Sequence, residues 1–526
     1  MSLLVSPVRT MSDDEIIDAV HKHGGMNQAA RALGIPLSTF KDRAKSVIDK
    51  RFTSTVKTPP EVMPPGVYIF SAAQAWTSVN IPFLKNLQVY AKYRDAKIFL
   101  AGYVHNTASK LKHKIEDFHP EIRKYIVKSS ISVADKVLFC AEMNITPTQA
   151  DPLMGLESYT RDKWAIFPHP RVSLKAVPVR WGDKPKHIMT TGVITKPNYL
   201  HRKVGLKAEF HHIAGAVIVE VDNDGDFFAR HLIADESGSF QDLLWHVNRE
   251  QIKLKCVEAV TWGDLHPDKL DPDVARGSWG LGKDWDDQPV YDNMLDVLKP
   301  SYQFFHDSFD MGRRSHHDIN DPHKRFKDLV SKTESVEDEV NKTGKLLKSV
   351  SRAWCKTVVV DSNHDRALMR WLKTADYKTD PVNALFFLRM QHAVYSAIER
   401  GYEINALEQA IKFSPYHDIS VRFLRNTESF TICNGAIECG MHGDIGANGA
   451  KGHINSFAKM GPKANIGHSH SAAIHEGVYV AGHSCVRDLG YNRGGLTSWS
   501  PSHVVTYPNG KRTIVTMSGD KFCGLF

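Results

Sequence analysis

The sequence predicts an α/β protein with several domains, and three observations support this prediction. Its 526 residues exceed the roughly 100–200 of one ordinary domain. Hydrophobic residues at 42% and charged residues at 24% are ordinary globular values, which excludes wholesale disorder. Strand-like apolar runs alternate with helical stretches, and this alternation is typical of sheets covered by helices.

Nothing in the sequence suggests a membrane or an oxidising compartment. No apolar run reaches the about 20 residues of a membrane helix, and charges such as Glu220 interrupt the longest candidates. The N-terminus has no long apolar stretch of the secretory kind. The seven cysteines include no C-x-x-C pair, so they do not indicate a disulfide framework. We expect a soluble, cytoplasmic protein with no membrane partner; the sequence leaves a homo-oligomer open.

Residues 1–50 are predicted to form a small helical unit. Ser12 and Glu15 have the spacing of a capping box, Gly24-Gly25 ends the first helix, and Ser38 could cap a third helix through Val47. The stretch from 26 to 47 resembles the helix-turn-helix of DNA-binding regulators and recombinases, whose last helix contacts DNA. The alternative is a three-helix unit used for assembly. The resemblance assigns DNA contact to Thr39, Lys41, Arg43 and Lys45.

Residues 51–65 are polar and proline-rich, which is typical of a linker. Residues 66–250 are predicted to form an α/β domain, because strand-like Val67–Ala72 and Lys97–Tyr103 flank helix-like Pro82–Tyr93. No phosphate-binding glycine motif occurs there, so the role of this domain is left open. Further strands are expected at Lys136–Phe139, Ala216–Val221 and Phe227–Leu232.

Residues 251–526 contain five segments with one layout, an apolar run that ends in Asp, Asn or His. Loops at one edge of a sheet converge on one cavity, so we expect these polar residues to meet. Carboxylate, imidazole and amide groups together favour Mn²⁺, Fe or Zn in a site of high coordination number, rather than a structural zinc. The residues are Asp264, His266, Asp307, Asp310, Asn363, His364, Asp365, His442, Asp444, His468 and His470. Between them, the charged stretch 331–348 is expected to be a solvated helical insertion.

Taken in order, the five segments resemble the calcineurin-like metallophosphoesterase superfamily. The pattern of that family runs D-x-H, G-D-x-x-D, G-N-H-D or E, a lone His, and G-H-x-H. Here His306 and Ser362 stand in place of two of its glycines, and neither change removes a ligand. The resemblance implies a four-layer αββα sandwich, preceded by the helix-turn-helix unit and the second α/β domain.

The same resemblance implies two divalent metal ions, Mn²⁺ in the first place and Fe or Zn as alternatives. Asp307 would bridge both ions. The other ligands of one ion would be Asp264, His266 and His470, and those of the other would be Asn363, His442 and His468. His364 would protonate the leaving oxygen or hold the phosphate. Asp310 and Asp365 would orient imidazoles.

The fold does not determine the substrate of this superfamily, which ranges from phosphoproteins to nucleotides, lipids and DNA. The helix-turn-helix resemblance and the net charge of +8 favour DNA. His364 matches a histidine of double-strand-break repair nucleases, and the stretches 158–177 and 190–221 resemble phage-encoded proteins. The whole combination resembles the pre-early DNases with which T-five-type phages degrade host DNA.

The sequence therefore predicts a metal-dependent deoxyribonuclease with DNA as its partner, in the cytoplasm of an infected host. It does not fix endo or exo action, or strand preference. Two alternatives stay open. One is a DNA-binding regulator with a phosphoesterase domain for small nucleotides; the other is a phosphoprotein phosphatase whose helical unit serves assembly.

Overall fold

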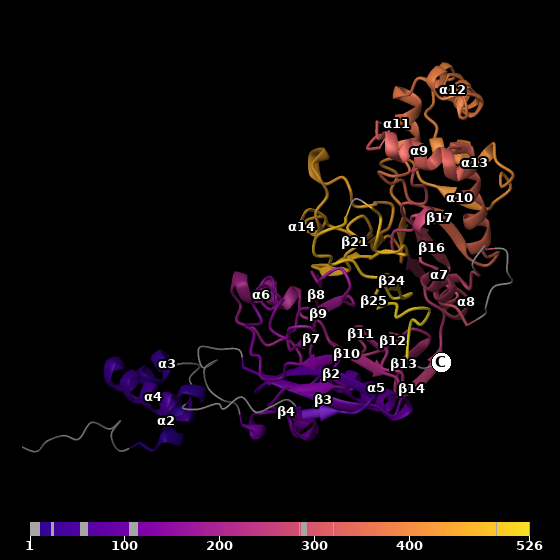
Figure 1. Ribbon diagram of the computed structural model, residues 1–526. Coiled ribbons are helices and arrows are strands. Elements are labelled where there is room, and N and C mark those ends of the chain that lie inside the picture. The colour runs from indigo at the N-terminus through magenta and orange to yellow at the C-terminus, as the bar shows by residue number, and fades with distance from the viewer. Residues whose placement is uncertain are drawn as a thin grey trace, which may run out of the picture. The chain divides into compact units, whose positions relative to one another are not determined.

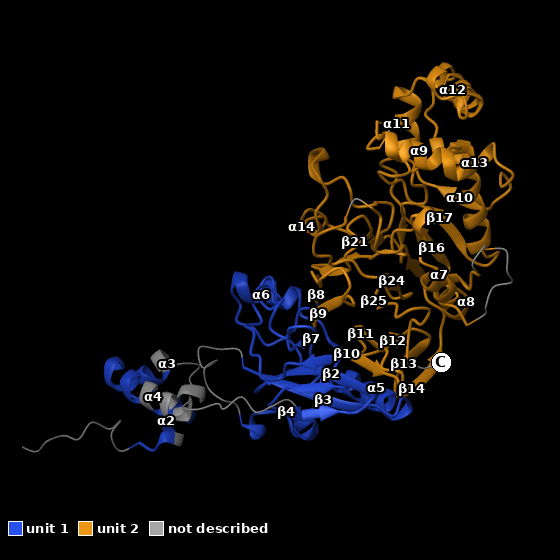
Figure 2. Cartoon of the chain, in the orientation of Figure 1, with its two compact units in different colours: residues 1–172, 190–217 blue, residues 173–189, 218–526 orange. Residues whose placement is uncertain are grey.

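The computed structural model describes residues 11–22, 26–52, 61–104, 114–282, 285, 292–318, 320–490 and 492–524. The chain divides into two compact units, residues 1–172 with 190–217 and residues 173–189 with 218–526 (Figure 2). The chain contains several sheets together with many helices, so the predicted α/β class is confirmed (Figure 1). The sequence instead predicts a division at residues 50, 65 and 250 from its composition and motifs, and that division stays a prediction.

Three helices near the N-terminus pack around one small core. They are α2 (Asp13–Lys22), α3 (Met26–Ala32) and α4 (Leu37–Phe52). The predicted capping box is present, because Glu15 N–H donates to Ser12 Oγ at 3.2 Å and Ser12 N–H donates to Glu15 Oε2 at 2.7 Å. The core consists of Ile16, Ala19, Ala29, Ala30, Ile35, Phe40, Ala44 and Val47.

The third of these helices differs from the prediction at both ends. Pro36 C=O already accepts a hydrogen bond from Phe40 N–H, so the helix starts before Ser38 and does not use it as a cap. It also continues beyond Val47 to Phe52. The turn before it contains Gly34 at φ 64°, a left-handed conformation that glycine adopts at little cost. The expected first-helix end at Gly24-Gly25 lies outside the described residues.

The predicted βαβ element is present in the first unit. It consists of β2 (Gly66–Gln74), α5 (Ile81–Tyr93) and β3 (Lys97–Tyr103), and β2 pairs with β3 in parallel. Asn80 caps α5 by accepting a hydrogen bond from Phe83 N–H. The strand β4 (Ile126–Val127) extends this sheet beyond β3. The remaining strands of this unit that pair with one another are β1 (Glu61–Met63), β5 (Ile131–Val133), β6 (Val137–Phe139) and β7 (Trp164–Phe167).

The second unit contains a six-stranded sheet with the order β18-β17-β16-β15-β24-β25. Its strands β15 to β18 run parallel, so their carboxyl ends lie at one edge. The antiparallel strand β24 pairs with β15 on the other side. The bounds are β15 (Ala259–Thr261), β16 (Tyr302–Phe305), β17 (Lys356–Val359), β18 (Val421–Phe423), β24 (Ser502–Thr506) and β25 (Arg512–Thr516).

A further run of strands in this unit has the order β9-β8-β22-β23-β21-β20-β19. Within it, β20, β21 and β23 are parallel. The bounds are β8 (Leu174–Val177), β9 (Lys186–Thr190), β19 (Thr431–Ile432), β20 (Ile437–Glu438), β21 (Lys463–Ile466), β22 (Ala473–His475) and β23 (Val478–Val480). A separate antiparallel sheet consists of β12 (Phe240–Asp242), β13 (Trp245–Asn248) and β14 (Gln251–Leu254).

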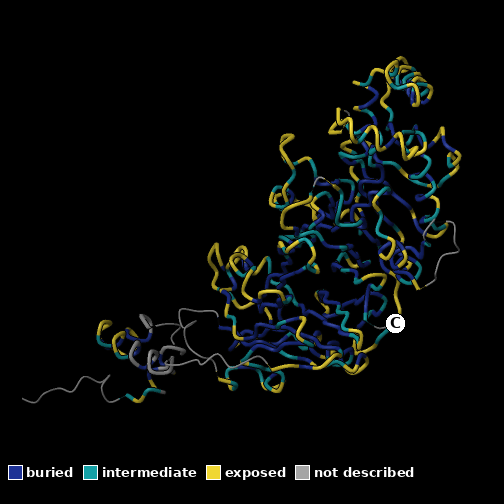
Figure 3. Tube along the Cα trace, viewed as in Figure 1, coloured by how far each residue is buried: buried dark blue, intermediate teal, exposed yellow. Residues whose placement is uncertain are grey.

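Helices accompany the six-stranded sheet (Figure 1). They are α7 (Pro272–Trp279), α8 (Met294–Leu298), α9 (Pro322–Ser331), α10 (Val336–Val350), α11 (Ala367–Thr374), α12 (Ala384–Glu399) and α13 (Ala406–Lys412). The short helix α14 (Ile454–Phe457) instead packs against β21 and β23. The prediction of a helix within 331–348 is confirmed by α10, but the prediction that this helix is solvated is wrong. Val336, Val340 and Leu347 recur at helical spacing and bury one face of α10, as Figure 3 indicates. None of the helices in the described part of the chain is both long and apolar enough to cross a bilayer.

Candidate metal centre

The five predicted segments meet at one place in the second unit. Asp264, Asp307 and Asn363 come two to four residues after the parallel strands β15, β16 and β17. His442 and His468 follow β20 and β21 of the other run of strands. Three groups have ligand atoms within 4.8 Å of one another: His266, Asp307 and His470; Asp264, Asp307 and His442; and His266, Asp310 and His364. The carboxyl ends of two sets of strands thus build one cluster.

Asp307 lies at the centre of the cluster and is 1% exposed. Its Oδ2 is 3.5 Å from Nε2 of His266, and its Oδ1 is 3.4 Å from Nε2 of His442. Burial alone would raise the pKa of this carboxyl, but the surrounding imidazoles, His442 foremost, hold the pKa well below its usual range. Asp307 is therefore a buried carboxylate whose two oxygens face different imidazoles, which is the arrangement of a bridging ligand.

The first side of the cluster contains His266, His470 and Asp264. Nε2 of His470 lies 3.1 Å from Nε2 of His266 and 3.2 Å from Oδ2 of Asp264. Among the described side chains, none donates a hydrogen bond to either oxygen of Asp264 or to Oδ1 of Asp307. Burial raises the pKa of Asp264 well above its usual range, and the charge of Asp307 adds to this. Buried oxygens without donors are costly unless a cation compensates them, so the donor set fits a divalent metal ion.

Asp310 orients His266 as predicted. Its Oδ1 is 2.6 Å from Nδ1 of His266, and its Oδ2 accepts a hydrogen bond from Asp268 N–H at 3.3 Å. Burial alone would lower the pKa of His266, but Asp310 and the other carboxylates raise it to about 9. A carboxylate on Nδ1 leaves Nε2 directed at Asp307 and His470, which is the usual way to orient a histidine ligand.

The second side of the cluster contains Asn363, His442 and His468. Oδ1 of Asn363 lies 3.1 Å from Nε2 of His442, and the rings of His442 and His468 are 5.2 Å apart between centroids, edge to face. Sequence reasoning missed a further member, His306, which it treated only as a replacement for glycine. Nδ1 of His306 lies 3.3 Å from Nδ1 of His442, and burial lowers the pKa of His306 to about 4. The signal that could have found His306 is its position directly before the bridging Asp307.

Glycine permits the close approach of these segments. A Cβ on Gly467 would lie 2.2 Å from Oδ1 of Asp264, and one on Gly263 would lie 2.6 Å from the backbone of His483. Several cluster residues also have left-handed backbone conformations, which are costly for residues with a Cβ and are concentrated at functional sites. These residues are His266 (φ 47°), Asp307 (φ 49°), His468 (φ 71°) and His470 (φ 56°).

His364 and Asp365 differ in their surroundings. The His364 side chain is 28% exposed; its ring centroid lies 4.8 Å from that of His266, and its Nδ1 is 3.9 Å from Asp310 Oδ1. It therefore lies beside the cluster while remaining accessible to solvent. Asp365 is buried, and its Oδ1 accepts a hydrogen bond from Phe309 N–H at 2.9 Å. This hydrogen bond holds the loop that carries Asp307. The sequence instead predicts that Asp365 orients an imidazole ring.

The predicted DNA-contacting residues lie on α4, in the first unit. Lys41 is exposed and Thr39 is half-buried. Arg43 donates a hydrogen bond to Oδ1 of Asp13 at 2.6 Å, so this guanidinium already has a partner within the helical unit. The side chain of Lys45 lies outside the described residues. The structure thus leaves Lys41 as the clearest candidate of the four.

Fold and cluster together define a mixed α/β protein with a candidate metal site of aspartates and histidines. No protein-family model matches the chain. The chain is 34% identical over 472 residues to Protein A1 of Escherichia phage T5, an alignment that covers 86% of this chain and 82% of that protein. The chain belongs to the family of phage T5 Protein A1.

Proposed function

We propose that the protein is a two-metal phosphodiesterase that hydrolyses DNA. The observation that supports this most is the position of Asp307, whose two carboxylate oxygens face His266 and His442 within two separate ligand groups. A carboxylate shared by two cations is the requirement of a two-metal centre for phosphoryl chemistry. Membership of a phage protein family supports a role for this enzyme during phage infection.

In this proposal the ligand set is the one that the sequence predicts. Asp264, His266 and His470 hold one ion together with Asp307. Asn363, His442 and His468 hold the other ion with the same carboxylate. Bound cations would neutralise the charge of the phosphate and make hydroxide available at neutral pH. Four imidazoles in the set favour Mn²⁺, Fe or Zn over Ca²⁺. The strands around the cluster would form the two inner layers of an αββα sandwich.

The residues around the ligands have separate tasks in the reaction. His364 lies beside the cluster and is partly open to solvent, so it can reach a bound phosphate without giving up a metal ligand. It donates a proton to the departing sugar oxygen, a general-acid task that enzymes most often give to histidine. Asp310 keeps the ring of His266 in place through the 2.6 Å contact to Nδ1. Asp365 keeps the 307–310 loop in position through Phe309 N–H.

The N-terminal helices contribute DNA binding in this proposal. Lys41 on α4 is exposed and can neutralise a phosphate. Arg43 would have to leave Asp13 to do the same. The reaction would take place in the cytoplasm of the infected host, where host DNA is the abundant substrate.

The test is incubation of the purified chain with Mn²⁺ and linear, circular and single-stranded DNA, with metal content measured on the same sample. We expect cleavage with two metal ions per chain and none in excess chelator. Cleavage that persists in chelator after dialysis would overturn the proposal. Hydrolysis of nucleotides or of a phosphoprotein, with DNA left intact, would favour one of the two alternatives from the sequence.

A further inference from the structure

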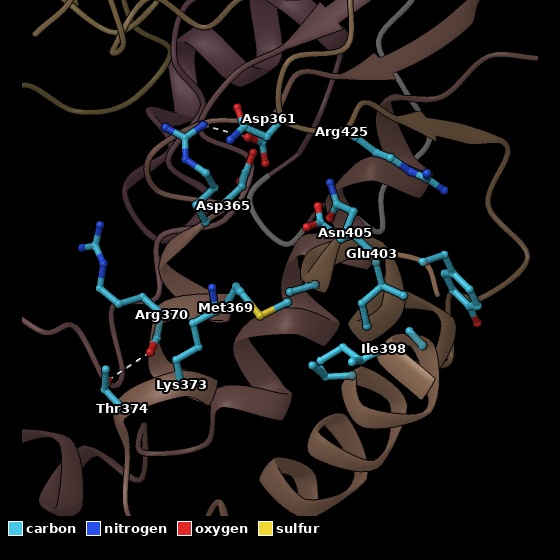
Figure 4. A pocket seen from close by; sticks show the side chains of 17 residues that line it. Asp361, Asp365, Met369, Arg370, Lys373, Thr374, Ile398, Glu403, Asn405 and Arg425 are labelled. Atoms are coloured by element: carbon cyan, nitrogen blue, oxygen red, sulfur yellow. Dashed lines mark hydrogen bonds and ion pairs between the residues drawn. The ribbon is translucent and has the colours of Figure 1, made fainter. Parts of the chain in front are cut away.

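The second unit contains a cavity of about 600 Å³ (Figure 4). It is lined by α11, by the second half of α12, and by the segments 402–406 and 425–426. Asp365 and Arg366 also line it, and they follow His364 directly in the sequence. The cavity lining therefore includes the two residues that follow His364, on the segment that also carries Asn363.

The charges inside this cavity are not balanced. Arg366 donates to Asp361 at 2.7 Å and also to Asp444, so its charge is compensated. Asp365 is buried, and its Oδ1 accepts a hydrogen bond from Phe309 N–H at 2.9 Å, so this carboxylate is engaged with the 307–310 loop. The exposed charged side chains of the lining are Arg370, Lys373, Arg425 and Glu403. The exposed part of the lining thus carries three cations and one carboxylate.

The basic residues are available to a ligand. Arg370 contacts the ring of His316, a neutral side chain in its usual state at pH 7, at 2.8 Å. Among the described residues, Lys373 and Arg425 have no carboxylate within ion-pair distance. Arg370 and Lys373 are three residues apart on α11, so they project from one face of that helix. The α11 residues 367–374 rise about 10 Å along the helix axis, which extends this basic face away from His364.

The lining also contains the polar residues Thr374, Asn405 and Asn426, several apolar side chains and an aromatic ring. Met369, Val394 and Ile398 line the cavity, and Tyr402 lies at its rim. Ile398 is 63% exposed and Tyr402 is 47% exposed, so both present apolar surface to a ligand. Basic side chains beside an exposed aromatic ring are the combination with which proteins bind single nucleic acid strands, because phosphates contact the cations and a base stacks on the ring.

We infer that this cavity binds the nucleotides that flank the cleaved phosphate of a nucleic acid strand. Arg370, Lys373 and Arg425 contact the flanking phosphates. A base stacks on Tyr402 and packs against Ile398. This inference rests on the proposed function, since it assigns the substrate strand a path from the metal cluster along α11.

The first experiment compares two substrates on the full chain with Mn²⁺. The variant Arg370→Gln/Lys373→Gln should raise the KM for a DNA strand about tenfold with little change in kcat. Hydrolysis of bis(p-nitrophenyl) phosphate, which is too small to reach the cavity, should not change. Lys378→Gln is the matched control, because Lys378 is an exposed lysine of the same region that does not line the cavity.

A second experiment measures binding without chemistry, from the anisotropy of a fluorescent oligothymidylate in chelator. Tyr402→Ala should weaken binding about tenfold, whereas Tyr402→Phe keeps the ring and should bind as the parent does. The Arg370→Gln/Lys373→Gln variant should also lower the slope of log K against log salt by about 1.4, from about 0.7 per phosphate contact on a single strand.

The outcomes separate this inference from the proposed function. A parent chain that cleaves DNA, with cavity variants that match Lys378→Gln in KM, affinity and salt slope, would overturn the inference alone. A parent chain that cleaves neither DNA nor bis(p-nitrophenyl) phosphate would overturn the proposed function. Equal losses in Tyr402→Ala and Tyr402→Phe would exclude stacking and with it the assigned base position.

Discussion

The metal-type cluster and the N-terminal helices were both predicted from short residue patterns. In the structure they differ in how far the predicted side chains are buried and paired. In the cluster, polar atoms are buried and several lack a hydrogen-bond donor among the described side chains, as in Asp264 and Asp307. On α4, Lys41 is exposed and Arg43 is already paired with Asp13. Both patterns name residue types suited to a ligand, but only the cluster buries carboxylate oxygens that a bound cation would compensate.

This difference shows what kind of evidence each region offers. A buried carboxylate oxygen without a donor has a free-energy cost that something must compensate, so it points to a cation. An exposed lysine is fully hydrated and costs nothing, so it is compatible with DNA binding but does not require it. Substitutions in the cluster should therefore affect metal binding strongly, whereas substitutions on α4 should affect DNA binding only slightly.

The substitution Asp307→Ala should have the largest effect. It removes the carboxylate that both ligand groups share, so metal binding and DNA hydrolysis should be lost together. Metal content from atomic absorption and a DNA cleavage assay measure the two losses. Asp273→Ala, at an exposed aspartate in the first turn of α7, is the control and should keep both. Full activity with two metals per chain in Asp307→Ala would mean that the bridge is assigned to the wrong residue.

The substitution His364→Asn should separate chemistry from metal binding. Asparagine keeps polarity and similar reach but cannot transfer a proton near neutral pH, so turnover should fall by about 10²–10⁴-fold while metal content stays the same. The fall in turnover should be smaller for a substrate with a better leaving group, because such a group needs less protonation. His317→Asn, at an exposed histidine, serves as control. Loss of a metal ion from His364→Asn would instead make this residue a ligand.

The sequence predicted the cluster well because ligand spacing is local. Each segment places its polar residues just after an apolar run, and parallel pairing brings the ends of β15, β16 and β17 to one edge without further information. The same local logic predicted β3 to the residue and the capping box at Ser12. The same approach failed for α10, because its many charged residues suggested a solvated helix although one face is apolar and buried.

The contacts that the sequence could not supply depend on tertiary packing. The pairing of Arg43 with Asp13 joins residues 30 positions apart, and nothing in the pattern of α4 indicates it. The contact between His306 and His442 spans 136 positions and involves a residue outside the family pattern. The cavity along α11 arises from segments between 361 and 426, so no single motif encodes it.

The substitution His306→Phe should weaken the binding of the proposed second metal ion, although it leaves the proposed ligands in place. Nε2 of His442 faces Asn363 Oδ1 and must be unprotonated to bind a cation, so Nδ1 carries the proton and donates it to Nδ1 of His306. Phenylalanine fills the space but accepts no hydrogen bond, and such losses typically reduce metal affinity about 10–100-fold. Calorimetric titration with Mn²⁺ measures this. His306→Asn, which retains an acceptor, should recover part of the affinity; equal affinities for His306→Phe and the parent would exclude this role.

The smallest expected effect concerns the N-terminal helices and compares two of their cations. Lys41→Gln removes an exposed charge, so the salt slope of DNA binding should fall by about 0.9, as for one phosphate contact on duplex DNA. Arg43→Gln instead removes the partner of Asp13; it should leave the slope nearly unchanged and lower the free energy of unfolding by at most about 1 kcal/mol, as partly exposed ion pairs do. Binding measured at several salt concentrations and urea unfolding of the same samples give both quantities. If Arg43→Gln lowers the slope as much as Lys41→Gln does, the Asp13 contact gives way to DNA and α4 contacts phosphate through both residues. If neither substitution changes the slope, the helical unit serves assembly.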